Sequence, residues 1–353
     1  MSIFLKDYTE IADILKENNI KKPFLCCGKS FQKTALFEYL KQFDFVLFDN
    51  IRPNPRFEDM ITAAELFKAE GCDFMIAAGG GSPMDSAKMI RLMTTNDVSK
   101  ALSEPMKNNG IKALFIPTTA GTGSEATKTS VFYVNDTEKL SIHSLDFIPD
   151  YVLFDERLLE TLPDYQRKVT ALDALCHSIE SYWSSAATDE SREYAEKSIR
   201  LFFEHKDAYM RNEREGNRGM LMASFYGGKA INITGTTAPH ALCYNITMTC
   251  GTAHGHSVAV VLATLWDYML EGDYPKDTLT LLSRLMGGES AADGARIFSS
   301  LIDEFELPYP KVSEDMLDGF VSKISISKLK TTPVPLGADE VRELYRRTLS
   351  DGI

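Results

Sequence analysis

The chain has 353 residues, of which 44% are hydrophobic and 25% charged, so it has the composition of an ordinary globular protein and the length for two domains rather than one. Its formal net charge of -12 argues against nucleic acid or an anionic membrane as a partner. Because the sequence has no apolar run of the roughly 20 residues that span a bilayer and lacks the layout of a signal peptide, we expect a cytoplasmic enzyme or binding protein.

The first half of the chain alternates apolar runs of strand length with amphipathic segments of helix length. Two prolines, Pro53 and Pro55, follow the second apolar run and predict an irregular loop there. The expected elements are helices over 8–18, 60–70 and 84–93, and strands over 24–27, 43–48, 73–78 and 113–116. This alternation predicts an α/β domain with a parallel sheet and with ligands at the carboxyl ends of its strands.

A glycine turn follows directly on the strand expected at 73–78. The three glycines 79–81 let the backbone approach a ligand, Ser82 is a candidate N-cap, and Pro83 suits a first helical turn. Exposed amides and the helix dipole at such a terminus attract a pyrophosphate, and an ordinary glycine turn is the alternative for this motif alone. A second loop, 117–125, is rich in hydroxyls and glycine and also follows a strand, so the two loops together favour a nucleotide site.

The pattern changes near Leu162 and Pro163, where the strand signals end. Helical periodicity then dominates to the end of the chain. The clearest helical segments are 169–183, 191–204 and 219–230. We therefore expect an α/β domain over residues 1–162 and an all-helical domain over residues 163–353.

Histidines in the second half suggest a metal site. Asp173 and His177 are four residues apart on one predicted helix, so both side chains project from the same face. His240 lies where a further helix opens, and His254 follows it after a glycine loop. One carboxylate and three imidazoles suit a divalent transition metal such as Fe(II) or Zn(II). Each histidine taken alone is more often a core or surface residue, and the spacing leaves both interpretations open.

Taken together, these motifs resemble the iron-containing (group III) alcohol dehydrogenase family, and the similarity runs through essentially the whole chain. The resemblance implies a Rossmann-like dinucleotide domain followed by an all-α domain, which is the dehydroquinate synthase-like fold, with the active site in the cleft between them. The implied metal ligands are Asp173, His177, His240 and His254. The implied contacts to the coenzyme are Gly28, Asn54, Gly79, Gly80, Gly81, Ser82, Asp85, Thr118, Thr119, Thr122, Ser124 and Lys139.

Two positions depart from the family pattern. Where the family often has a second histidine, four residues after the first one of its pair, this chain has Tyr244, so we expect Tyr244 or water to carry the proton. Many NAD-preferring members have an acidic residue after the first strand, whereas here Gly28 is followed by Lys29. Without a carboxylate to repel its 2′-phosphate, NADPH should serve at least as well as NADH.

The segment 228–256 resembles a branch of the family linked to phosphonate biosynthesis, whose members reduce phosphonoacetaldehyde to 2-hydroxyethylphosphonate. We therefore expect a small anionic aldehyde or alcohol as substrate, with its phosphonate held by Lys229, His256 and Lys128. A general short-chain alcohol dehydrogenase is one alternative. A sugar-phosphate cyclase is another, although the metal site of these lyases normally begins with glutamate. The sequence leaves the oligomeric state open, a homodimer included.

Overall fold

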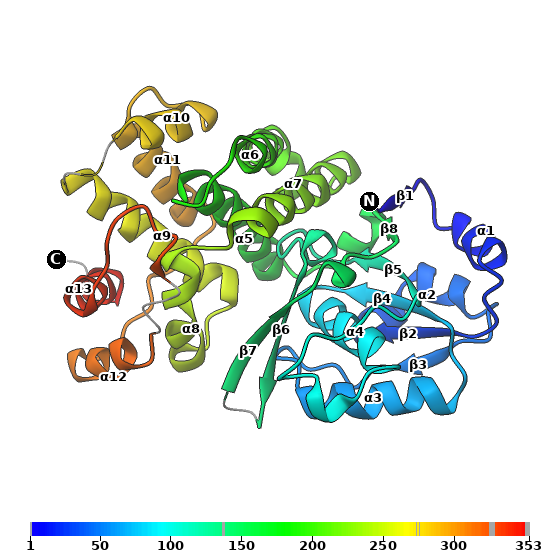
Figure 1. The fold of residues 1–353 in the computed structure, drawn as a ribbon. Coiled ribbons are helices and arrows are strands. Elements are labelled where there is room, and N and C mark those ends of the chain that lie inside the picture. Colours follow the sequence, from blue (N-terminus) through cyan, green and yellow to red (C-terminus); the bar gives the residue numbers. More distant parts are fainter. Residues whose placement is uncertain (1, 136–137, 273, 275, 325–328, 350–353) are drawn as a thin grey trace. The chain divides into compact units, whose positions relative to one another are not determined.

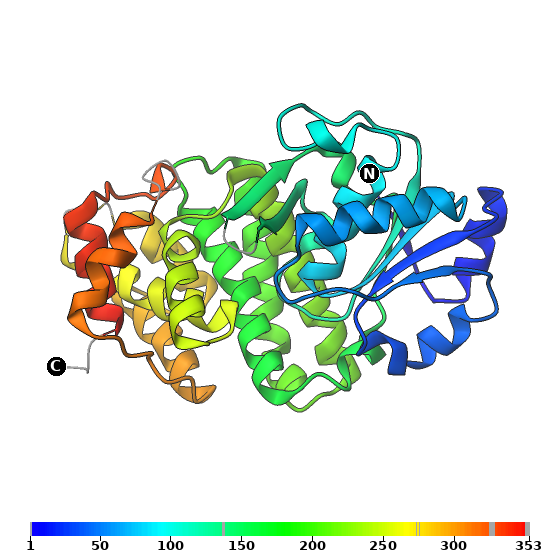
Figure 2. The ribbon, with the colours of Figure 1, turned by 90° about the horizontal axis from the view of Figure 1, so that it is seen from below.

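The computed structural model describes residues 2–135, 138–272, 274, 276–324 and 329–349. The chain divides into two compact units, Met1–Leu162 and Pro163–Ile353 (Figure 1 and Figure 2). This division falls at the point where the strand signals of the sequence end. Among the described residues, no helix combines the length and the apolar character that a membrane span requires.

The first unit is built on a six-stranded sheet in which all neighbouring strands run parallel. In spatial order the strands are β1 (Ile3–Leu5), β8 (Tyr151–Leu153), β5 (Lys112–Pro117), β4 (Phe74–Gly79), β2 (Pro23–Cys27) and β3 (Val46–Phe48). Together with the helical second unit, this sheet confirms the fold class expected from the sequence. β1 and β8 were not expected, because three residues carry no periodic signal, and β3 is shorter than the predicted run 43–48.

Both faces of the sheet's central strands are buried. The helices of this unit are α1 (Glu10–Glu17), α2 (Ala35–Leu40), α3 (Phe57–Ala69) and α4 (Gly81–Met93). On β4, Met75 and Ala77 belong to a hydrophobic cluster with Phe67 of α3 and Met84 of α4. The alternate residue Phe74, which points to the opposite face, is equally buried. Burial on both faces is typical of parallel sheets and explains the continuous apolar runs in the sequence.

A small antiparallel sheet follows the second glycine loop. It consists of β6 (Thr129–Val134) and β7 (Glu138–His143), which pair from Thr129 with His143 to Val134 with Glu138. Neither strand was expected. A short 3-10 helix, Ser124–Ala126, joins the loop to β6, so the loop is held between β5 on one side and this small sheet on the other.

The second unit contains only helices among its described residues. They are α5 (Asp164–Trp183), α6 (Asp189–Met210), α7 (Arg214–Thr234), α8 (Ala238–Cys250), α9 (His254–Glu271), α10 (Asp277–Leu285), α11 (Ala291–Glu304), α12 (Leu317–Ser322) and α13 (Ala338–Leu349). α5 packs against α6, α7 and α9. Every residue of α5 from Ala171 to Trp183 is buried. Polar groups in that stretch lie inside the unit, where each needs a partner.

Candidate metal and dinucleotide sites

Three side chains of the kind that bind metals meet in the helical unit. Asp173 comes from α5, His240 from the first turn of α8, and His254 is the first residue of α9. Their ligand atoms all lie within 4.8 Å of one another. Oδ1 of Asp173 is 3.4 Å from Nε2 of His240 and 3.8 Å from Nε2 of His254. Helix packing thus brings two histidines from different helices to one aspartate.

A glycine allows α9 to begin this close to α5. A Cβ atom on Gly255 would lie 2.1 Å from the carbonyl oxygen of Val169 and 2.9 Å from Cβ of Asp173. Any larger residue at this position would push the start of α9 away from α5. His254 would then move away from Asp173, so the local sequence supplies both the ligand and the space that it needs.

The cluster fits a divalent transition metal. Oδ1 of Asp173 and Nε2 of His240 are buried, and within the described residues they make no hydrogen bond, although buried polar atoms normally find a partner. A carboxylate oxygen and imidazole nitrogens are ligands that Fe(II) and Zn(II) accept. The side chain of His254 is 43% exposed, whereas the other two are almost covered. The cluster is therefore accessible from solvent on the His254 side.

Neighbouring charges hold the aspartate in the form that a cation requires. Burial by itself would raise the pKa of Asp173, but the surrounding histidines, His177 first, lower it well below its usual range. Burial would likewise lower the pKa of His240, but Glu180 and Asp173 raise it to about 9. The carboxylate is therefore anionic, as metal binding requires, whereas His240 must release its proton to become a ligand.

Glu180 fixes the orientation of the His240 ring. It is fully buried and lies on the same face of α5 as Asp173, two turns later. Its Oε1 is hydrogen bonded to Nδ1 of His240, and its Oε2 accepts hydrogen bonds from the N–H and the hydroxyl of Thr237 at 2.6 and 2.8 Å. A carboxylate on the far nitrogen is typical of histidines that bind metals. No role was expected for Glu180 from the sequence, although its seven-residue spacing from Asp173 was a usable signal.

Two further expected residues lie beside the cluster. His177 stacks on His240 with ring centroids 4.6 Å apart, but the group of ligand atoms that lie within 4.8 Å of one another comprises the other three expected ligands. Tyr244 is half-buried on α8, one turn after His240. The assignments of His177 as fourth ligand and of Tyr244 to the proton route therefore stay predictions.

The two phosphonate contacts expected in this unit have different surroundings. His256 is buried, and its Nδ1 and Nε2 lie 3.0 Å from the Tyr165 hydroxyl and 2.9 Å from the Pro308 carbonyl oxygen. Since a carbonyl only accepts, Nε2 carries the proton, and burial lowers the pKa of His256. Both ring nitrogens of His256 thus have protein partners, and its contact with a phosphonate stays a prediction. Lys229 on α7 lies with Nζ 4.8 Å from the ring centroid of Tyr194.

The predicted strand, glycine turn and helix are present in the first unit. β4 ends at Gly79, whose φ is 155° and where a Cβ atom would lie only 2.4 Å from the ring of Pro83. The N-cap of α4 is Gly80 rather than Ser82, which corrects the sequence-based expectation. Ser82 instead donates its hydroxyl hydrogen to the carbonyl oxygen of Pro53 at 2.6 Å. No side chain caps α4, so the first N–H groups of the helix remain available to an anion.

The second glycine loop lies directly against the first. The N–H of Thr118 donates to the last carbonyl oxygen of β4 at 2.9 Å. A Cβ atom on Gly80 would lie 3.1 Å from Oγ1 of Thr119, and one on Gly81 would lie 3.1 Å from Cγ2 of Thr122. The glycines therefore let the hydroxyl-bearing loop approach. Amides of one loop and hydroxyls of the other come together at one edge of the sheet.

The remaining expected coenzyme contacts fall into two groups. Asp85 and Ser124 bind each other, with the Ser124 hydroxyl donating to the carboxylate at 2.7 Å, so they shape the loops from within. Gly28 at the end of β2 is half-buried, and its nearest neighbouring atom would lie 4.0 Å from an added Cβ. Asn54 is exposed and Lys139 on β7 is half-buried. For all five residues, direct contact with a coenzyme stays a prediction.

A parallel α/β unit with two glycine loops at its strand ends, followed by a helical unit with a buried carboxylate and histidine cluster, defines a metal-dependent oxidoreductase that uses a dinucleotide. The chain belongs to the iron-containing alcohol dehydrogenases. The family model described as iron-containing alcohol dehydrogenase matches residues 3–156, and the model of the family's C-terminal part matches residues 168–349. The family uses iron and NAD(H), and the Asp173, His240 and His254 cluster suits that metal.

Individual relatives agree with this assignment. A choline dehydrogenase of Bacillus subtilis is 28% identical over 340 residues, covering 88% of this chain and 83% of the relative. An NADPH-dependent butanol dehydrogenase of Clostridium saccharobutylicum is 29% identical over 262 residues, covering 70% of this chain and 68% of the relative. A sulfoacetaldehyde reductase of Bifidobacterium kashiwanohense, solved with NAD+, has a TM-score of 0.91 at 23% identity and covers 99% of this chain and 96% of that one. At that identity the likeness shows the shared fold.

Proposed function

We propose that the protein catalyses the reversible, NAD(P)H-dependent reduction of a short aldehyde to a primary alcohol. The observation that carries this proposal is the cluster of Asp173, His240 and His254. Two of its buried polar atoms have no hydrogen bond within the described residues, and its third side chain is open to solvent. A site of this kind suits a metal ion with room beside it for a substrate.

The named residues divide the chemistry between them. Asp173, His240 and His254 would hold the metal, which when bound supplies a Lewis acid for the oxygen of the aldehyde or alcohol. The amides at the start of α4 and the hydroxyls of residues 118–122 would bind the coenzyme, whose nicotinamide carries the hydride. Tyr244 or water moves the proton of the alcohol. No covalent nucleophile is needed.

Oxidation of NADPH in the presence of propanal, before and after removal of the metal with a chelator, tests the proposal. We expect steady turnover with Fe(II) or Zn(II) present and almost none after chelation, with NADPH binding retained. Turnover that does not depend on metal would contradict the proposal. The same assay addresses the sugar-phosphate cyclase alternative, because those lyases regenerate their coenzyme and do not consume it steadily.

We also propose phosphonoacetaldehyde as the particular substrate, on the strength of the resemblance in residues 228–256. Lys229 lies in this segment and is half-buried. Within the described part of the chain, no carboxylate pairs with its ammonium group, and its contact is with the ring face of Tyr194. A ring face covers only one side of an ammonium group, so N–H donors remain for a phosphonate oxygen.

Lys229→Met tests this contact with the substrate. One charge-assisted hydrogen bond is worth roughly 1.5 to 3 kcal/mol, so kcat/KM for phosphonoacetaldehyde should fall about ten- to a hundredfold, while that for propanal stays the same. Lys197→Met is a matched control, because Lys197 on α6 also lies over an aromatic ring. Its Nζ is 5.8 Å from the ring centroid of Tyr226 on α7. Equal wild-type efficiency on both aldehydes would leave a general short-chain aldehyde reductase.

A further inference from the structure

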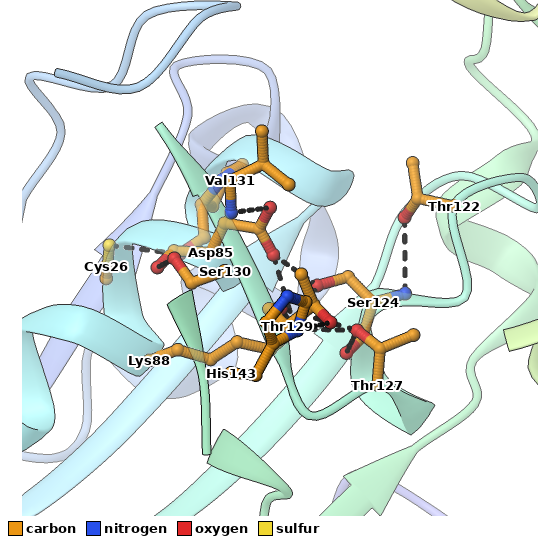
Figure 3. A network of polar contacts seen from close by, with 11 residues as sticks. Cys26, Asp85, Lys88, Thr122, Ser124, Thr127, Thr129, Ser130, Val131 and His143 are labelled. Carbon is orange, nitrogen blue, oxygen red and sulfur yellow. Dashed lines mark hydrogen bonds and ion pairs between the residues drawn. The ribbon is translucent and has the colours of Figure 1, made fainter. Parts of the chain in front are cut away.

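Lys88 is a fully buried lysine on α4, and it lies beside the second glycine loop (Figure 3). Its Nζ donates to the hydroxyl oxygens of Ser124 and Thr127 at 2.7 and 3.0 Å and to the carbonyl oxygen of Thr129 at 2.7 Å. It also pairs with Asp85, one turn earlier on the helix, at 3.2 Å. Burying an ammonium group is costly unless it is fully paired, and here oxygens surround all of its N–H groups.

Asp85 extends this network to β6. Its Oδ1 accepts the hydroxyl hydrogen of Ser124 at 2.7 Å, and its Oδ2 accepts the N–H of Val131 at 3.0 Å. Its main-chain carbonyl oxygen accepts the hydroxyl hydrogen of Ser130 at 2.8 Å. Figure 3 shows these side chains converging from α4, from the end of the loop and from the start of β6. Lys88 and Asp85 therefore tie α4 to the whole segment that follows the loop.

This segment determines where the loop lies. The loop is held at its start by β5, and at its end the N–H of Ser124 donates to the hydroxyl of Thr122 at 3.3 Å. Thr119 and Thr122 pack against the glycines at the start of α4. If Ser124 were released from Lys88 and Asp85, the loop hydroxyls could shift relative to the N-terminal amides of the same helix.

We propose that Lys88, together with Asp85, is a positioning residue for dinucleotide binding. It holds the hydroxyls of residues 118–122 and the first amides of α4 in the arrangement that the coenzyme meets. The inference rests on the proposed function, because it requires NAD(P)H to bind at these two loops. A preformed pair of loops binds more tightly than a mobile pair, since the entropy of ordering has already been lost on folding. Lys88 acts through the loop, because it is itself fully buried.

Lys88→Met removes the ammonium group and keeps much of the bulk of the side chain. We expect the dissociation constant of NADPH to rise at least tenfold, which corresponds to about 1.4 kcal/mol. The KM for NADPH should rise as well, while kcat at saturating NADPH and the metal content change little. Amides in residues 118–127 should exchange hydrogen faster than in the wild type. A general loss of stability would instead also lower kcat or metal content and would speed hydrogen exchange outside residues 118–127.

Lys112→Met is the matched control. Lys112 is an exposed lysine at the start of β5, whereas the loop follows the other end of that strand, and it donates to the side chain of Asn18. Its replacement should leave NADPH affinity and hydrogen exchange in the loop unchanged. If Lys88→Met does not fold, Ser124→Ala serves instead. It removes one hydrogen bond to Lys88 and one to Asp85, and it should weaken NADPH binding by a smaller factor.

The outcomes separate this inference from the proposed function. Unchanged NADPH affinity in Lys88→Met, or in Ser124→Ala where the first variant does not fold, overturns the positioning role and leaves the proposed function intact. A wild-type protein that binds neither NADPH nor NADH overturns the proposed function itself.

Discussion

Each unit of the chain buries a cluster of charged side chains, and the two clusters differ in how their polar atoms are satisfied. Around Lys88, the ammonium, carboxylate and hydroxyl groups hydrogen bond to one another. Around Asp173, the carboxylate Oδ1 and Nε2 of His240 lie 3.4 Å apart, and within the described residues neither makes a hydrogen bond. The first cluster is complete with protein atoms alone, whereas the second has buried ligand atoms that a metal ion would satisfy.

This difference separates a structural support from a binding site. An unsatisfied buried polar group costs about 1 to 3 kcal/mol, so a fold keeps such groups where a ligand satisfies them in the working protein. A satisfied network needs no ligand and instead makes its neighbours rigid. Substitutions in the helical unit should therefore impair metal binding and turnover, and substitutions around the glycine loops should impair coenzyme binding.

The largest effect is expected for His254→Ala, which removes one expected ligand from the open cluster. Loss of the metal removes several kcal/mol of transition-state stabilisation, so kcat/KM should fall about a thousandfold or more. NADPH binding should persist, because its expected residues belong to the other unit. Elemental analysis and coenzyme titration measure the two properties separately. Full activity with unchanged metal content would remove His254 from the site.

A smaller effect is expected for Glu180→Gln, which keeps the shape of the side chain and removes the negative charge beside Nδ1 of His240. Loss of such a partner typically lowers metal affinity about 10- to 100-fold. Competition with a chelator of known affinity measures the change. Glu193→Gln, which alters an exposed ion pair on α6, is the control. Equal metal affinity in the wild type and Glu180→Gln would mean that packing alone orients the ring.

Gly28→Asp tests coenzyme choice in the first unit. There is space for a side chain at this position, and a carboxylate there would repel the 2′-phosphate of NADPH. We expect kcat/KM with NADPH to fall about tenfold or more relative to NADH, and Gly28→Asn, which adds similar bulk without charge, to show a much weaker change. A wild-type preference for NADH of more than about a hundredfold, roughly 2.7 kcal/mol, would contradict this interpretation.

The last expected effect is on stability rather than on activity and comes from Glu125, the last residue of the second glycine loop. Burial raises its pKa from 4.5 to about 7, so the folded protein binds this proton more tightly than the unfolded chain does. The contribution to stability is therefore full below about pH 4.5 and is lost as the pH rises toward 7, by at most about 1.4 kcal/mol per pH unit. Glu125→Gln should remove this slope. Denaturant unfolding of both proteins across this pH range measures it, and identical pH dependence would exclude the effect.

Local patterns predicted the central strands and the glycine turn well. The apolar run 73–78 followed by three glycines was sufficient to predict β4 and the turn after it. A buried apolar run that ends in such a turn is typical of a strand before a ligand loop. The three-residue strands β1 and β8 were missed because so short a run becomes a strand only through pairing with its neighbours. Ser82 was assigned as a cap because the local sequence does not reveal the carbonyl oxygen of Pro53, to which its hydroxyl donates.

The sequence by itself determined which chemical groups are present and on which kind of element they lie: Asp173 on a buried helix, histidines in a helical half, and glycines after strands. Only the tertiary structure decided which groups meet. The packing of the helices brings Asp173 close to His240 and His254 and places Glu180 against the ring of His240. It also places the ring of His256 beside the hydroxyl of Tyr165. Residue spacing specifies which side chains share a face of one helix, but contacts between helices depend on how the whole core packs, which no local pattern encodes.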